Sequence, residues 1–366
     1  MQPEAFKILA VNPGSTSTKV GLYFDDRPEF TRNIQHAEAE MAQFRQRPVV
    51  DQQQFRGLRI EAVLAESGLN VRELHAVVGR GGLLPPLAGG TYLVDEAMLD
   101  ELRLARRGEH ASNLGAFLAQ DIAQKAGVHA YVVDPVSVDE WPPCARLSGS
   151  ALLERQCLSH ALNSKAVAKR YARECGKAYE SLRLLVAHLG SGISVSAHNG
   201  GCMTDVTNSR EEGAFSTERA GSVPGIQLVD LCFTGKYTRK QVEDLLFREG
   251  GLYSYLGTKD LLEVERRIAS GDAKARTVYE AMVYQIAKEV GAMATVLNGR
   301  VDALLVTGGM ANSHQLVSNL RDRVGWIAPV VVYPGEDELQ ALTEGVLRVL
   351  RHEEQLRVFR SAETRL

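Results

Sequence analysis

Residues 7–24 read KILAV-NPGSTSTK-VGLYF, two apolar segments joined by a turn of small and polar residues. Apolar and β-branched residues favour strands on both sides, and the Pro-Gly-Ser sequence between them favours a turn. The same pattern returns at residues 184–197, where Gly190 stands 176 residues after Gly14, and Asn199-Gly200 adds a second tight turn. Two similar hairpins half a chain apart predict two related halves.

The rest of the chain alternates strand-like and helix-like segments. Short apolar strands are expected at residues 76–78, 130–133, 303–306 and 330–332. Helical periodicity is seen at residues 111–126, 151–176, 239–247, 260–268 and 275–297, and in a last helix that ends at Leu350. In the long helix 275–297, we expect Tyr279, Met282, Ile286, Val290 and Met293 to face the core. This alternation predicts an α/β fold.

Composition narrows the class of protein. The chain has 366 residues, which suggests two domains, and its 45% hydrophobic and 24% charged residues are typical of a globular protein. A net charge of −3 argues against binding nucleic acid, and no apolar run of about 18 residues is present to cross a membrane. Residues 1–7 lack a basic-then-apolar leader, and the five cysteines form no C-x-x-C pair. We therefore expect a cytoplasmic protein with reduced thiols.

Three loops rich in small residues each follow a predicted strand, at residues 12–19, 188–194 and 307–311. Such loops expose backbone N–H groups, which bind phosphate when hydroxyls and a lysine stand nearby. Other phosphate and acyl-transfer motifs are missing: Thr234-Gly235-Lys236-Tyr237 does not complete a P-loop, no G-x-G-x-x-G follows the first strand, and no G-x-S-x-G occurs. Three such loops in one α/β chain together favour phosphate binding.

Six motifs carry a resemblance to a known family. They lie at residues 12–19, 78–83, 108–115, 160–163, 188–192 and 334–338, in a region that runs from residue 7 to about residue 350. These segments resemble those of the butyrate kinases, which belong to the acetate kinase family of the acetate/sugar kinase–Hsp70–actin superfamily. The resemblance implies two related α/β domains of the ribonuclease H-like type with an interdomain cleft. Residues 1–152 plus 341–366 would carry the first phosphate loop and the acyl-substrate side, and residues 153–340 the second phosphate loop and the adenosine loop.

The resemblance also implies an activity and its partners. It implies reversible transfer of phosphate from ATP to a short-chain fatty acid such as butanoate, giving an acyl phosphate and ADP. Mg²⁺ would be the cofactor, ATP and the fatty acid the small-molecule partners, and a homo-oligomer of two or more copies the assembly. No nucleic acid or membrane partner is implied. Alternatives are a branched-chain or other short-chain acid, a sugar hydroxyl as acceptor, and an ATP-driven switch that acts on a protein partner.

Site residues follow from the matched motifs. The resemblance implies catalytic roles for Arg80, Asp134, His160, His188 and Arg219. It implies phosphate and nucleotide binding by Asn12, Ser15, Ser17, Lys19, Gly190, Ser191, Gly192, Gly308, Gly309 and Met310. It implies a substrate pocket with His110, Asn113 and Ser159, and a magnesium site at Glu338 with Asp134. Among the neighbouring acids, we expect Asp337 to stabilise the start of the last helix instead.

Two positions depart from the acetate kinase pattern. The first catalytic arginine of acetate kinases stands three residues before a His-Gly-Gly sequence, where this chain has Val77, and Arg80 directly precedes Gly81-Gly82. We expect Arg80 to take that role. The residue before His160 is usually aromatic in the family and is Ser159 here. A small residue would widen an acyl pocket, so the preferred chain length is left open.

Overall fold

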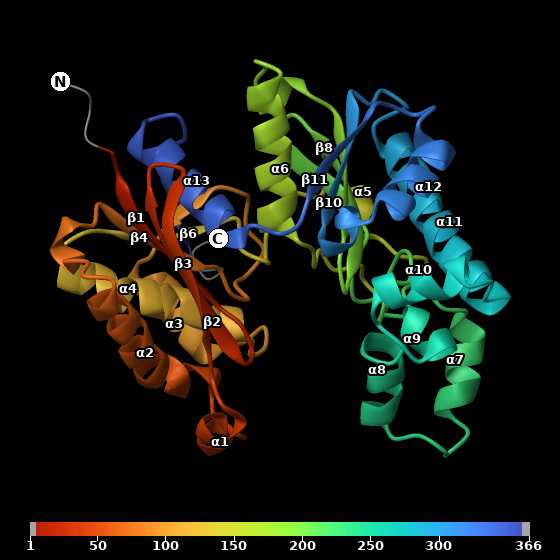
Figure 1. Cartoon of the computed structure of the whole chain (residues 1–366), viewed down its shortest axis with the longest axis horizontal. Helices are drawn as coiled ribbons and strands as arrows, with labels where there is room; N and C mark the ends of the chain where they lie inside the picture. Colours follow the sequence, from red (N-terminus) through yellow and green to blue (C-terminus); the bar gives the residue numbers. More distant parts are fainter. Residues whose placement is uncertain (1–4, 361–366) are drawn as a thin grey trace. The chain divides into compact units, whose positions relative to one another are not determined.

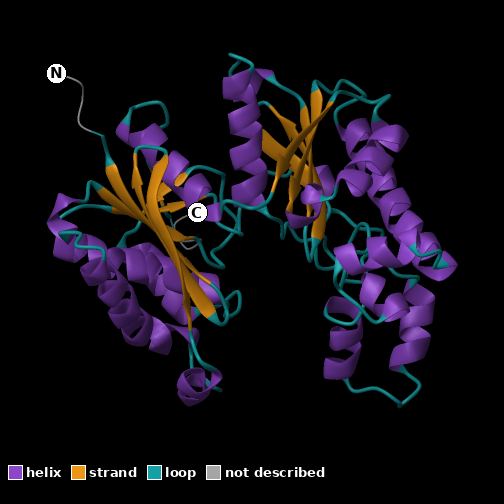
Figure 2. Ribbon diagram, viewed as in Figure 1, coloured by secondary structure: helices purple, strands orange, loops and turns teal. Residues whose placement is uncertain are grey.

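The computed structural model describes residues 5–360, which divide into two compact units (Figure 1). Unit 1 contains the described residues up to Asp139, together with Ala161–Ala166 and the segment from Asp337 onward. Unit 2 contains Glu140–His160 and Val167–Glu336. Each unit is a sheet covered by helices, as Figure 2 shows.

Unit 1 is built on a seven-stranded sheet in the order β12-β5-β6-β4-β1-β2-β3. The strands are β1 (Lys7–Pro13), β2 (Ser17–Phe24), β3 (Arg27–Gln35), β4 (Ala76–Arg80), β5 (Thr91–Leu93), β6 (Ala130–Val133) and β12 (Arg357–Val358). β1, β2 and β3 form an antiparallel meander, whereas β1, β4 and β6 run parallel. The carboxyl ends of β1, β4 and β6 therefore lie at the same edge of the sheet.

Helices cover both faces of this sheet. They are α2 (Gln53–Glu66), α3 (Glu96–Leu104), α4 (Leu114–Ala126) and α13 (Glu338–Leu350), while the short helix α1 (Glu38–Met41) buries no residue. One face packs on α2, α3 and α4 through a core that includes Leu9, Ile60, Met98 and Phe117. The other face packs on α13 through residues such as Ile8, Leu342 and Val346. The near-continuous apolar character of β1 and β4 follows from this burial on two sides.

Unit 2 repeats the plan with a five-stranded sheet in the order β11-β10-β7-β8-β9. Its strands are β7 (Leu184–Leu189), β8 (Ile193–Asn199), β9 (Cys202–Val206), β10 (Ala303–Gly308) and β11 (Val330–Pro334). β7, β8 and β9 form an antiparallel meander, and β7, β10 and β11 run parallel. This matches β3-β2-β1-β4-β6 of unit 1 strand for strand, which confirms the two related halves predicted from the hairpins.

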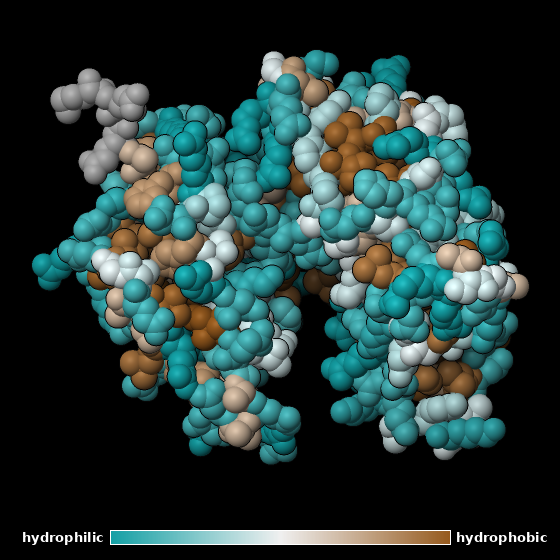
Figure 3. Space-filling view, viewed as in Figure 1, coloured by the Kyte–Doolittle hydropathy of each residue, from teal (hydrophilic) through white to brown (hydrophobic). Residues whose placement is uncertain are grey.

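The helices of unit 2 are unequally divided between its two faces. They are α5 (Pro143–Arg146), α6 (Ala161–Glu174), α7 (Gly225–Cys232), α8 (Arg239–Phe247), α9 (Gly251–Leu256), α10 (Leu261–Ala269), α11 (Ala273–Val296) and α12 (His314–Val324). α6 covers one face, while α10, α11 and α12 cover the other. All five residues predicted to face the core in the long helix are buried on α11. Figure 3 shows hydrophobic surface over α7, whose side chains include exposed Ile226 and Val229.

Some sequence-based expectations differ from the structure. The helix expected over residues 151–176 is wrong in its first part, because α6 begins only at Ala161. The preceding residues form an irregular segment that Arg155 ties down by donating to the Ala145 carbonyl at 2.7 Å. The contacts place residues 140–152 in unit 2 and 161–166 in unit 1, whereas the sequence-based division assigned them the other way round. Among residues 5–360, no helix is both long and apolar enough to cross a bilayer.

One close contact in unit 1 positions the end of β4. A Cβ at Gly115, the second residue of α4, would collide with the backbone of Arg80, 2.7 Å from its amide nitrogen. Glycine at this position lets the start of α4 pack directly against β4. The contact thereby fixes the position of the Arg80 backbone, from which the side chain extends.

Gly115→Ala should therefore destabilise the protein by at least about 2 kcal/mol, because the neighbouring atoms are backbone and cannot swing aside. Gly57→Ala is the matched control, since Gly57 lies inside α2 with open space around it and should gain about 0.5–1 kcal/mol. Urea unfolding of both variants measures the difference. Equal stabilities for the two variants would contradict the contact.

Candidate functional site

The first predicted phosphate loop is the turn between β1 and β2. Asn12 and Lys19 are cross-strand partners at its base, and the amide of Gly14 donates to the Ser17 carbonyl at 2.8 Å to close the turn. Ser15 is exposed at the tip, while Asn12 is buried. The hairpin thus brings the predicted polar side chains of the loop to one end of β1.

Arg80 and Glu338 meet at the same end of the sheet. Arg80 Nη1 pairs with Glu338 Oε1, and Asn12 Nδ2 donates to Glu338 Oε2. Glu338 opens α13, and Asp337 caps that helix by accepting from the amide of Gln340 at 3.0 Å, as expected for a first-turn acid. Unit 1 therefore joins three of the predicted site residues into one contact group.

Asp134 directly follows β6 in a left-handed backbone conformation, with φ of 37°. Its side chain is buried and its Oδ1 accepts from the amide of Gly90 at 2.7 Å. Such backbone geometry is uncommon for residues other than glycine and often occurs at functional sites. Nearby, a Cβ on Gly89 would lie 2.6 Å from Lys165 Nζ, so the buried lysine also reaches this corner.

His110 and Asn113 are both used in the local fold of unit 1. Asn113 is fully buried; its Oδ1 accepts from the amide of Leu83 at 2.9 Å, and its Nδ2 donates to the Gly108 carbonyl. His110 Nδ1 accepts from the amide of Ser112. The surrounding protein atoms and the positive charge of Arg80 lower the pKa of His110. The charge of Arg80 therefore acts on His110, while the Asn113 amide holds the backbone around His110.

In unit 2, the two predicted histidines stack on each other. The rings of His160 and His188 are nearly parallel, with centroids 3.7 Å apart. His160 Nδ1 lies 3.0 Å from the Ser194 hydroxyl, and His188 Nε2 lies 2.9 Å from Glu336 Oε1. His188 is the next-to-last residue of β7 and is 1% exposed, so its ring is fixed by the sheet.

Arg219 lies against the second predicted phosphate loop. A Cβ on Gly192 would stand 2.5 Å from Arg219 Nη1, so glycine makes room for the guanidinium. Arg219 Nη1 donates to the carbonyl of Ser209 at 3.0 Å, and burial lowers the pKa of Arg219. Ser216, which the sequence analysis missed, ties the loop to this turn: its hydroxyl donates to the Ser191 carbonyl and accepts from the Arg219 amide.

A pocket of about 360 Å³ opens beside this loop. Gly190 and Ser191 line one side, and Gly309 and Met310 of the third predicted loop line another. Lys259 also lines it, and Leu262 gives it apolar surface. The structure thus brings the second and third loops, predicted separately from sequence, to one pocket, with Gly308 at the end of β10 in a left-handed conformation.

Ser159 is buried beside His160 and its hydroxyl lies 3.8 Å from the sulfur of Met203. Met203 is fully buried on β9. The position expected to widen a pocket is therefore bordered by a flexible apolar side chain.

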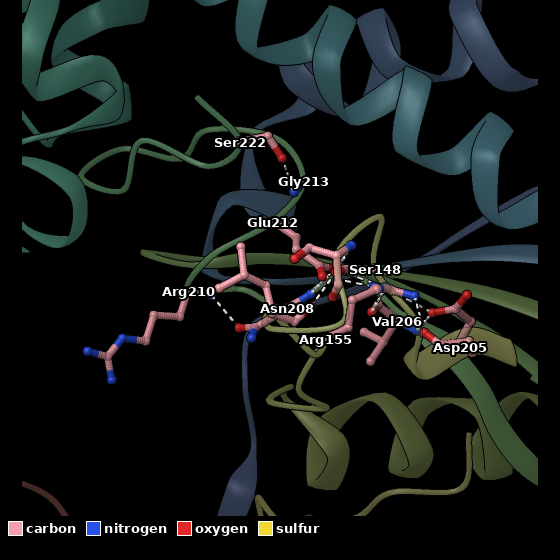
Figure 4. Close-up of polar contacts among 12 residues, drawn as sticks. Ser148, Arg155, Asp205, Val206, Asn208, Arg210, Glu212, Gly213 and Ser222 are labelled. Carbon is pink, nitrogen blue, oxygen red and sulfur yellow. Dashed lines mark hydrogen bonds and ion pairs between the residues drawn. The ribbon is translucent and has the colours of Figure 1, made fainter. Parts of the chain in front are cut away.

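Figure 4 shows an ionic cluster that the sequence analysis also missed. Arg155 makes a two-pronged contact with Glu212, at 2.8 and 2.9 Å, and a third contact with Asp205 at 3.2 Å. Its guanidinium also lies over the Trp141 ring. The hydrogen bond with Glu212 raises the pKa of Arg155. The cluster also fixes the loop that leads from β9 to Arg219. The arginine stands 50 and 57 residues from the two acids, so the sequence carries no local signal for such pairing.

One family model matches part of the chain. Residues 151–325 match the model of the acetokinase family. The fold is similar to that of an acetate kinase from Porphyromonas gingivalis, with 18% identity, TM-score 0.76, and coverage of 93% of this chain and 99% of the other. A propionate kinase from Francisella tularensis aligns with 16% identity, TM-score 0.73, and 93% and 98% coverage. A putative N-acetylmannosamine kinase from Listeria monocytogenes has 13% identity, TM-score 0.50, and 95% and 100% coverage.

These findings bear on the fold and on residues 151–325. They confirm the expected α/β fold of the acetate and sugar kinase type. The matched segment contains His160, His188 and Arg219. The roles of the individual site residues stay predictions.

A buried histidine, His36, lies next to the first loop and makes the stability of the fold depend on pH. Thr18 accepts from Arg56 Nη1, and its hydroxyl forms a hydrogen bond with His36 Nε2 at 2.9 Å. Burial, together with the positive charge of Arg56, lowers the pKa of His36 from 6.5 to about 4. The folded protein therefore holds His36 neutral at pH values where the unfolded chain binds a proton.

The stabilisation from His36 should be fully present above pH 6.5 and should fall steadily as the pH drops from about 6.5 to about 4. At about 1.4 kcal/mol per pKa unit, the total loss is on the order of 3 kcal/mol. His36→Gln should remove this slope from urea-unfolding curves measured across that range. His352→Asn, at an exposed position with positive φ that asparagine tolerates, should keep it. An unchanged slope in His36→Gln would refute the assignment.

Proposed function

We propose that this chain is an ATP-dependent kinase of short-chain fatty acids, with butanoate as the preferred acceptor. The reaction gives butanoyl phosphate and ADP and runs in both directions. The observation that carries the proposal is the group in unit 2: stacked His160 and His188, with Arg219 against the loop that also lines a pocket. The acetokinase match over residues 151–325 supports a carboxylate as the acceptor.

The charge of the acceptor decides which groups the site needs. A fatty acid has a pKa similar to that of a glutamate side chain, about 4.3, so it is ionised at neutral pH and needs no general base. Its carboxylate instead repels the terminal phosphate of ATP. At 4 Å, two like charges repel by about 4 kcal/mol at an effective dielectric constant of 20. A kinase of this kind therefore needs fixed cations more than a base.

Arg219 is suited to this task. Its Nη1 is anchored on Ser209, and in the described chain no hydrogen bond from the protein occupies its Nε and Nη2. A guanidinium held at one nitrogen can present the others as a planar fork to phosphoryl or carboxylate oxygens. In unit 1, Arg80 is the corresponding cation, and its pairing with Glu338 fixes its direction.

The transfer itself is an in-line displacement. A carboxylate oxygen of the fatty acid forms a bond to the terminal phosphorus, and the bond from that phosphorus to the bridging oxygen of ATP breaks. ADP leaves with the electron pair, and no proton is lost from the acceptor. His188, oriented by Glu336, lies beside the second loop and can donate to an oxygen of the transferred group.

The donor set fits Mg²⁺ as the cofactor. Across residues 5–360, no cluster of three or more metal-ligating side chains is present. Mg²⁺ bound with a nucleotide requires only one or two carboxylates, because phosphate oxygens and waters complete its shell. Asp134 and Glu338 would supply these carboxylates, and the ion would neutralise charge on the phosphates. The homo-oligomer implied by the resemblance stays a prediction.

A series of carboxylic acids tests the activity directly. With ATP, Mg²⁺ and hydroxylamine, linear C2 to C6 acids and isobutyrate should give acyl hydroxamates, with the largest yield at C4. Ser159, small and bordered by Met203, is the reason to expect room beyond acetate. Glucose in place of the acid is the control for a sugar kinase. If no acid gave hydroxamate above an enzyme-free blank, the proposed activity would be wrong.

Arg219→Ala should lower kcat by about 10³-fold, because it removes a cation that stabilises charge in the transition state. The fold should survive, since the side chain is anchored through a single nitrogen. Arg239→Ala, a fully solvated arginine of unit 2, is the matched control and should stay within twofold of wild type. Near wild-type turnover in Arg219→Ala would remove this residue from the mechanism.

A further inference from the structure

Arg56 is a buried cation that the proposed mechanism does not use. It lies in the first turn of α2 and is 0% exposed. Its Nε and Nη2 donate to the side-chain oxygen of Gln52, at 3.0 and 2.9 Å. The remaining donors all reach the turn between β1 and β2. Within residues 5–360, no carboxylate is paired with it, and burial alone lowers its pKa to about 10.

The contacts with the turn go to carbonyl oxygens. Nη1 donates to the carbonyls of Gly14 and Ser17, each at 2.9 Å, and Nη2 donates to the carbonyl of Ser15 at 3.2 Å. Nη1 also donates to the Thr18 hydroxyl at 2.9 Å. Burying a charge without a counter-ion is costly, so these dipoles replace the lost hydration of the guanidinium. Arg56 thus holds the turn through hydrogen bonds to its carbonyl oxygens.

Peptide geometry means that these hydrogen bonds to the carbonyls also determine where the N–H groups of the turn point. In a trans peptide, the C=O and the N–H of the following residue point to opposite sides of the peptide plane. Because the carbonyls of Gly14 and Ser15 point at Arg56, the amides of Ser15 and Thr16 point away from it. Both residues are exposed, and in the described chain neither amide donates to a protein acceptor. Two successive outward N–H groups form an anion-binding concavity.

We infer that Arg56 is a positioning residue that holds the loop at residues 12–19 in its phosphate-binding shape. It acts from behind the loop and does not touch the substrate. Its buried positive charge adds to the field that the anion meets at Ser15 and Thr16, since no carboxylate neutralises it locally. This inference rests on the proposed function for its kinetic consequence, while its effect on the loop is independent of the reaction catalysed.

Arg56→Lys is the most informative variant, because it keeps the charge but cannot reach the carbonyls of Gly14, Ser15 and Ser17 together. We expect kcat/KM for ATP to fall at least tenfold, with the KM for the fatty acid within twofold of wild type. Arg59→Lys is the matched control, one turn along the same helix, where the side chain is half exposed and paired with Glu40. It should behave as wild type.

Hydrogen exchange measured by mass spectrometry gives a second readout on a peptide that covers residues 12–19. Inorganic tripolyphosphate should slow hydrogen exchange in this peptide in the wild-type enzyme and in Arg59→Lys. In Arg56→Lys, the factor by which tripolyphosphate slows exchange should be at least tenfold smaller. Full protection or full kcat/KM in Arg56→Lys would overturn the inference. If Arg56→Lys did not fold, absence of tripolyphosphate protection in the wild-type enzyme would overturn it. A wild-type enzyme that is protected but makes no acyl phosphate would sink the proposed function alone.

Discussion

The parallel pairing of β1 with β4 and β6, and of β7 with β10 and β11, is the constraint on which both halves depend. Parallel strands end at one edge of a sheet, and ligands of open α/β sheets bind at that edge. In unit 1, Asn12 is the next-to-last residue of β1, Arg80 ends β4 and Asp134 directly follows β6. In unit 2, Gly308 ends β10 and His188 is the next-to-last residue of β7. Residues far apart in sequence thereby reach a common edge within each unit.

Three arginines, Arg80, Arg219 and Arg56, are held in three different ways, and each way suits a different task. Arg80 is paired with a carboxylate, so its charge is partly balanced when no substrate is bound. Arg219 is anchored on a neutral carbonyl through one nitrogen, which keeps its charge available. Arg56 is saturated by carbonyls and a side-chain amide and is sealed from water.

Much of the fold was predictable because hairpins, buried strands and the long helix carry strong periodic signals. The start of α6 was not, because apolar residues at 151–160 follow a helical rhythm while Arg155 holds that segment in an irregular path. Motifs placed the loops and the histidines, since these residues are close in sequence. Arg56, Ser216 and Lys165 were missed, because their significance lies in contacts with segments 25 to 76 residues away that leave no local pattern.

Three consecutive acids, Glu336, Asp337 and Glu338, serve three separate purposes. Glu336 belongs to unit 2 and contacts His188, Asp337 caps α13, and Glu338 belongs to unit 1 and contacts Arg80. The spacing of this short connection is therefore set on both sides by side-chain contacts. One inserted residue inside the first turn of α13 would swing the later carboxylate by about 100° around the helix axis. A substitution at one of these acids should therefore disturb only the contact of that acid, whereas a change in the length of the connection should disturb several contacts at once.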